Sequence, residues 1–127
     1  MDNYDVEDIL FGIIDPVLKP LGFTVFKGPS INGVDYNHAV ILTNNFHTNE
    51  DYNKAPGAYV TIFAKIGSHG QRPNEIKNAQ RAVEMALLNY RDNRNLFDIE
   101  IGFITPVNDA KEGFFAITFN LQIITQK

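Results

Sequence analysis

One stretch of the chain, residues 59–90, joins a strand pattern to a helix pattern and constrains the fold more than any other. From Tyr59 to Ile66 the side chains alternate, so that one set of positions is wholly apolar and the other is mixed. After a Gly/Ser turn signal, Pro73 stands where a first helical residue is favoured, because its missing N–H would be unpaired there in any case. The apolar residues beyond it recur at helical spacing: Ile76, Ala79, Val83, Ala86, Leu87 and Tyr90. The stretch predicts a strand with one face on a core, followed by an amphipathic helix.

A second amphipathic helix is predicted at the N-terminus. Apolar residues follow helical spacing from Val6 to Leu21, and Asp2 or Asp5 is available as a cap. Because a proline disfavours helical geometry at the residue before it, Pro16 predicts a kink or break near Asp15.

Alternating apolar and polar residues predict the strands. They are Phe23–Lys27, Ala39–Thr43, Tyr59–Ile66, Phe97–Phe103 and Phe115–Ile123. In the fourth of them Phe97, Ile99, Ile101 and Phe103 alternate with Asp98, Glu100 and Gly102. We therefore expect an α+β fold over residues 1–127: a single domain with two helices packed on one face of a mostly antiparallel sheet of four to five strands.

Composition limits the class of protein. The length of 127 residues and the 44% of hydrophobic residues suit one soluble globular core. The absence of cysteine excludes a disulfide framework, a thiol nucleophile and a zinc–thiolate site. The net charge of −4 argues against broad binding to a phosphate backbone. The acidic N-terminus and the short apolar run from Ile9 to Ile14 indicate neither a targeting segment nor a membrane span.

Residues that could carry catalysis are scattered. The histidines His38, His47 and His69 lack the spacing of a helical metal pair, and His38 is more simply a partly exposed polar residue. The segment Gly67–Gly70 lies between strand and helix but lacks the ending of a phosphate-binding loop. We expect no catalytic residue, no metal site and no cofactor, and hence no enzyme.

Interaction with a partner is a more promising use of the loops and the acidic strand. The long polar segment 44–57 carries two aromatic side chains that either contact a partner or tuck back onto the domain. Asp98 and Glu100 share one strand face and point either at solvent or at basic residues of a neighbour. Pro106–Gly113 is predicted to be a protruding, charged hairpin loop. The candidate interface residues are Phe46, His47, Tyr52, Asp98, Glu100, Asn108, Asp109 and Lys111.

The order of elements resembles the tail-terminator or tail-completion (minor tail) proteins of long-tailed bacteriophages. The resemblance covers nearly the whole chain and rests on hydrophobic pattern and spacing. The segments that carry it are a helix ending in Lys19-Pro20-Leu21-Gly22, the strands Phe23–Lys27 and Ala39–Thr43, the strand, turn and helix of residues 59–90, and a closing pair that ends in Phe115–Leu121.

The resemblance implies a non-enzymatic virion protein at the head–tail junction, made in the host cytoplasm. Such subunits form a homo-oligomeric ring, commonly a hexamer, that binds tail-tube and head-connector proteins, with no membrane or specific nucleic acid as partner. Here the loops 44–57 and 105–113 would reach neighbouring subunits. One alternative is a neck or adaptor ring protein of a short-tailed phage, with a ring of higher order. Another is a small ligand- or peptide-binding α+β domain, with Phe63, Tyr59 and Phe46 lining a pocket between helices and sheet.

Overall fold

The computed structural model describes residues 3–28, 33–44, 57–66, 74–91, 97–107 and 112–125, without the side chains of 3–5, 44, 97 and 125. The elements are α1 (Asn3–Leu18), the 3-10 helix η1 (Lys19–Leu21), β1 (Thr24–Lys27), β2 (His38–Asn44), β3 (Gly57–Lys65), α2 (Asn74–Asn89), β4 (Phe97–Val107) and β5 (Phe114–Thr125). Each predicted helix and strand is present, and β4 and β5 are longer than predicted.

Within the described residues the strands form one five-stranded sheet in the order β1-β2-β3-β5-β4. The β1–β2 pair is parallel, and the other pairs are antiparallel. β3 is therefore the central strand, while β1 and β4 lie at the two edges. The α+β class and the mostly antiparallel sheet are confirmed.

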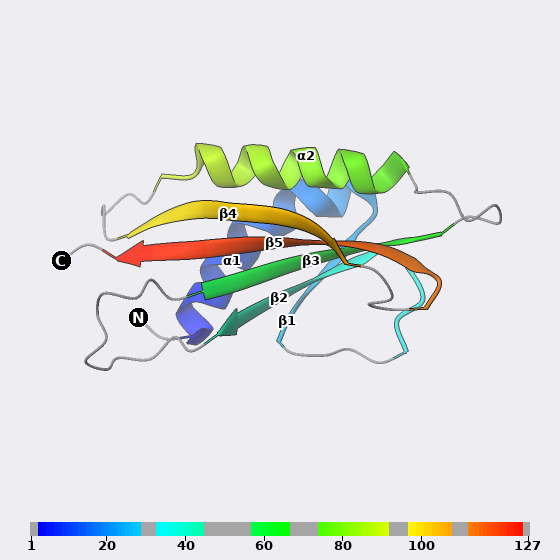
Figure 1. Ribbon diagram of the computed structural model, residues 1–127, viewed down its shortest axis with the longest axis horizontal. Coiled ribbons are helices and arrows are strands. Elements are labelled where there is room, and N and C mark those ends of the chain that lie inside the picture. Colours follow the sequence, from blue (N-terminus) through cyan, green and yellow to red (C-terminus); the bar gives the residue numbers. More distant parts are fainter. Residues whose placement is uncertain are drawn as a thin grey trace.

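Both helices cover the same face of the sheet. α1 crosses behind the β1–β2 side and α2 lies along the β4 side (Figure 1), and the two helices also pack against each other. The core forms between them and the inward side chains of the sheet. Its fully buried members include Leu10, Ile14, Leu18, Ala39, Ile41, Ala58, Val60, Ile62, Ala64, Ala79, Val83 and Phe119. The predicted stripe of α2 is thus the one that is buried.

α1 runs through Pro16 to Leu18 without interruption, so a break near Asp15 is wrong, while a kink there stays a prediction. Pro16 removes one helical hydrogen bond and costs about 3 kcal/mol in a helix interior. Ile14 and Leu18 flank it and are fully buried, and each such burial contributes about 1.5 to 3 kcal/mol. Packing therefore outweighs the local preference. The helical path ends after η1 at Gly22, whose φ of 90° suits glycine and whose N–H donates to the Lys19 carbonyl at 3.1 Å.

We expect Leu87→Ala to lower the free energy of unfolding by about 2 to 5 kcal/mol, because it opens a cavity in the core. Leu87 is only 2% exposed on α2. The control variant Arg81→Ala, on the solvent side of the same helix, should change it by less than about 0.5 kcal/mol. Urea unfolding measures both values. Equal midpoints for the two variants would contradict the buried stripe of α2.

Candidate functional site

The edge strand β4 contains an irregularity that changes which of its side chains face the core. Up to the bulge, Ile99 pairs with Ile123 and Ile101 with Leu121, on the face that the helices cover. The register then shifts, so that Phe103 pairs with Asn120 and Ile104 with Phe119. Gly102 is the extra residue of a β-bulge, and from there on the alternation is inverted.

The bulge turns Phe103 away from the helices. Continuous alternation placed Phe103 beside Ile99 and Ile101, and that prediction is wrong. Phe103 is 64% exposed, the largest value among the large hydrophobic side chains of the described residues. Ile104 takes the inward position and packs against the core. A Cβ atom at Gly102 would lie 3.2 Å from the Asn120 carbonyl oxygen, which makes a small residue preferable at the bulge.

Phe103 shares its face of β4 with the two acidic residues that the sequence singled out. Asp98 pairs with Ile124 and Glu100 with Gln122, so both project from the side opposite the helices, and both are exposed. Of the predicted interface residues, these two are confirmed as exposed neighbours on one strand face. Phe46, His47, Tyr52, Asn108, Asp109 and Lys111 lie outside the described residues.

The predicted hairpin loop begins later than expected. Thr105, Pro106 and Val107 belong to β4 and pair with β5. Proline cannot donate a hydrogen bond to a sheet and is tolerated at an edge strand, which is the position that β4 occupies among the described strands. The strand therefore continues through three residues that the sequence pattern predicted to lie in a loop.

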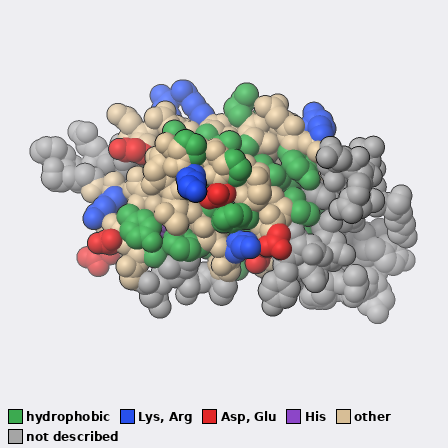
Figure 2. All heavy atoms as spheres, turned by 180° about the vertical axis from the view of Figure 1, so that it is seen from behind, with side chains coloured by type: hydrophobic (Ala, Val, Ile, Leu, Met, Phe, Trp, Pro, Cys, Tyr) green, Lys and Arg blue, Asp and Glu red, His purple; other side chains and the backbone are tan. Residues whose placement is uncertain are grey.

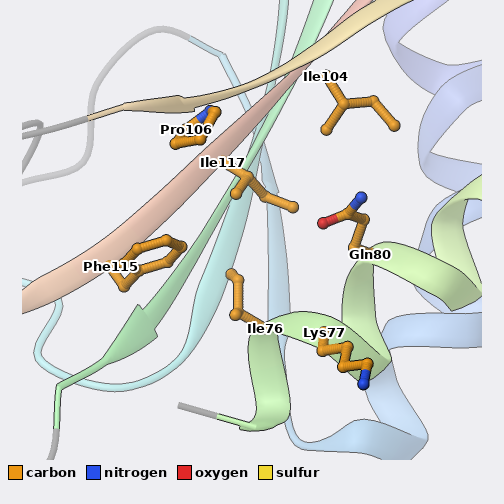
Figure 3. Close-up of a pocket in the computed structure, with 7 residues that line it drawn as sticks. All are labelled: Ile76, Lys77, Gln80, Ile104, Pro106, Phe115 and Ile117. Atoms are coloured by element: carbon orange, nitrogen blue, oxygen red, sulfur yellow. The ribbon is translucent and has the colours of Figure 1, made fainter. Parts of the chain in front are cut away.

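A pocket lies on the helix side of the same edge, between α2, β4 and β5. Its volume is about 220 Å³. The apolar side chains that line it are Ile76, Ile104, Pro106, Phe115 and Ile117. Lys77 and Gln80 add polar groups from α2: the Gln80 amide faces the apolar side chains, whereas the Lys77 ammonium is directed away from them (Figure 3). The pocket thus combines five apolar side chains with one inward amide, and it has a cation at its rim.

The pocket proposed for the ligand-binding alternative is wrong in its residues. Tyr59 and Phe63 alternate with the buried, helix-facing residues of β3 and so belong to the opposite face of the sheet. Phe46 lies outside the described residues. The observed pocket uses residues of α2, β4 and β5 instead.

On the face away from the helices, His38 is buried within a cluster of aromatic rings. It is 2% exposed, and its ring stacks on Phe63 with centroids 4.6 Å apart. The rings of Phe26, Tyr36 and Phe114 lie edge-on around it. Its Nδ1 lies 2.7 Å from the Tyr36 carbonyl oxygen, which can only accept, so Nδ1 carries a proton.

The prediction that His38 is a partly exposed polar residue is therefore wrong. Its place at the start of β2, among strands rich in phenylalanine, was the available signal. On the side of the sheet opposite the helices, the imidazole of β2 therefore contacts aromatic rings of β1, β3 and β5.

Charges on the helix side are mixed. In the view of Figure 2, hydrophobic side chains stand between single basic and acidic groups, and the described residues form no continuous patch of one sign. One close pair joins the Lys27 ammonium to the Asp8 carboxylate at 2.7 Å. The described residues include no group of three or more His, Cys, Asp or Glu side chains placed to hold a metal ion. None of the described helices has the length and apolar character needed to cross a membrane.

No protein-family model matches the chain, and no curated protein matches its sequence. Function is therefore argued from the geometry of the β4 edge.

The bulge predicts an unusual ranking of two neighbouring substitutions. Ile104→Ala should lower the free energy of unfolding by about 1 to 3 kcal/mol, because Ile104 packs against the core. Phe103→Thr, which keeps a strand-forming residue, should lower it by less than about 1 kcal/mol. Chemical denaturation of dilute protein measures both. The reverse ranking would show that the alternation of β4 continues through Gly102 without a bulge.

Proposed function

We propose that the chain is a non-enzymatic structural protein of a phage virion, a ring subunit that terminates or completes the tail at the head–tail junction. The observation that carries the proposal is the exposed Phe103 on the long edge strand β4. The resemblance in the order of elements supplies the place in the virion, and the geometry of β4 supplies the contact surface.

The exposure of Phe103 favours an assembly role on energetic grounds. Burying a phenylalanine side chain contributes about 1.5 to 3 kcal/mol, and the isolated chain forgoes most of that contribution at this position. A β-bulge commonly re-aims one side chain, and here it aims the large ring outward rather than inward. An exposed aromatic side chain at a sheet edge contributes this free energy of burial when a second protein covers it.

A ring requires contacts of a particular kind. Each subunit must present two different surfaces, since one surface joins the next subunit and the other receives the previous one. The two faces of the β4 edge differ in this way: one carries Phe103, Asp98 and Glu100, and the other carries the pocket under α2. Further contacts with tail-tube and head-connector proteins belong to the proposal through the segments between β2 and β3 and between β4 and β5. A neck or adaptor ring of a short-tailed phage, the alternative assembly, requires the same two kinds of subunit surface.

A second candidate function is favoured by the pocket itself. A mostly apolar lining with a cation at the rim suits a small apolar ligand that carries an acidic group. Native mass spectrometry of purified protein would detect such a ligand as added mass that disappears on denaturation.

The assembly proposal is tested by the mass of the native particle across a concentration series, from light scattering after gel filtration, with negative-stain imaging of the largest species. We expect a ring for the unaltered chain. Phe103→Thr should shift the mass toward the monomer at the same concentration, because the ring loses its apolar contact.

The matched control is Met85→Gln, which removes another exposed apolar side chain, on α2, and should leave the ring intact. Rings should also bind tail-tube subunits of the same virion. A chain that is monomeric at all concentrations and does not bind tail tubes would contradict the proposed function. Equal masses for Phe103→Thr and the unaltered chain would remove the role of Phe103.

A further inference from the structure

We infer that the Phe103 ring of one copy inserts into the pocket under α2 of a neighbouring copy, head to tail, with Glu100 of the first copy beside Lys77 of the second. The inference rests on the proposed self-assembly and names the contact that holds neighbouring subunits together.

The size of the pocket suits a phenyl ring. An engineered protein cavity of about 150 Å³ with apolar walls is known to bind benzene. The pocket under α2 is open to solvent, has a volume of about 220 Å³ and is lined by five apolar and two polar side chains. A phenylalanine side chain therefore fits, and its burial there removes the most exposed large apolar group of the described residues from water.

The charges around the ring and around the pocket are complementary. On the Phe103 side the outward positions of β4 before the bulge carry the carboxylates of Glu100 and Asp98, and the next outward residue after Phe103 is Thr105.

At the pocket the one charged lining residue is Lys77, which is exposed and whose ammonium is directed away from the apolar walls (Figure 3). The other polar lining residue, Gln80, donates from Nε2 to the Glu84 carboxylate at 3.2 Å. Arg81 lies one helical turn further along α2 and is also exposed. Opposite charges beside an apolar anchor set the orientation of two partners and speed their encounter.

One backbone irregularity creates both halves of the contact. Because Gly102 is inserted, Phe103 faces outward and Ile104 faces inward, where Ile104 forms part of the pocket wall. Without the extra residue Phe103 would fill the inward position and Ile104 would face solvent. The bulge therefore makes the protruding ring and shapes the cavity that receives it.

The arrangement favours a second copy over closure within one chain. Phe103 and the pocket lie at the same sheet edge but on opposite faces of the sheet, so the ring cannot enter the pocket of its own chain. A contact between different surfaces of identical chains is heterologous, and it repeats until it closes into a ring or extends as a filament.

The absence of cysteine from the chain allows a direct test by disulfide cross-linking. Two single variants, Glu100→Cys and Lys77→Cys, are mixed and treated with a mild oxidant, so that any bond between positions 77 and 100 must join two chains. Phe103 and the apolar walls of the pocket stay unchanged. Peptide mass spectrometry identifies the two linked residues. A time course of the same measurement gives the rate at which the disulfide forms.

We expect the bond to form at least about tenfold faster than between Glu100→Cys and the control Asn78→Cys, because assembly raises the effective concentration of the thiols that it brings together. Asn78 is exposed, like Lys77. It follows Lys77 in the sequence, and its side chain therefore points in a different direction around the axis of α2. Adding Phe103→Thr to the Glu100→Cys chain should reduce its rate of disulfide formation with Lys77→Cys to the rate of the Asn78→Cys control.

Equal rates for the two pairs in a sample that forms rings would overturn this contact and leave the proposed function standing. Equal rates in a sample without any assembly would overturn both. A small ligand found in the pocket of the assembled ring would also overturn the contact, since the two occupants exclude each other.

Discussion

The packing of the two helices on one face of the sheet, around the buried side chains of the central strand β3, is the constraint on which the rest of the structure depends. Ala58, Val60, Ile62 and Ala64 are fully buried, and β3 has a partner strand on each side. Because strand side chains alternate with a period of two, a slip of one residue would turn this entire set away from the helices. The register of β2 and β5 follows from β3, and the positions available to α1 and α2 follow from the same face.

The bulge in β4 follows from that constraint acting on an ambiguous sequence. The inward residues of β5 fix which face of β4 must be apolar. In the sequence of β4, however, the apolar residues before Gly102 occupy odd-numbered positions, and those that face the helices after it occupy even-numbered positions. Ile99 and Ile101 belong to the first set, whereas Ile104 and Pro106 belong to the second. One extra residue at Gly102 lets both pairs face the helices. The cost is that Phe103, which lies between them, must point outward.

The sequence predicted the elements well because their signals are local and repeated. The alternation of β3 and the helical spacing of Ile76, Ala79 and Val83 each place several residues with one assumption. The errors share a different cause. Pro16 is helical because its neighbours are buried, and His38 is buried because the adjacent Tyr36 and three aromatic rings from other strands surround it.

The same reason explains what was missed at the candidate site. Asp98 and Glu100 were placed correctly, since two residues on one strand face need only the strand to be known. The outward turn of Phe103 needs the register against β5, which no local pattern contains. A lone glycine inside a strand pattern is a recognised sign of a bulge, and Gly102 was the one signal that could have found it. The pocket could not be predicted from the sequence, because α2, β4 and β5 each supply part of its wall and their relative positions depend on the tertiary structure.

The two edges of the sheet are unequal, and this difference favours the β4 edge as the contact surface of the proposed assembly. β1 has 4 residues and ends at Lys27, whose ammonium contacts Asp8 and lies 5.3 Å from the centroid of the Phe11 ring. Short strands with charged ends are a common means of keeping a sheet edge from pairing with other chains. β4 has 11 residues, an exposed aromatic ring and a pocket on its other face. In the proposed assembly, association therefore uses the β4 edge, and a subunit with two unlike surfaces at that edge has the asymmetry that ring closure requires.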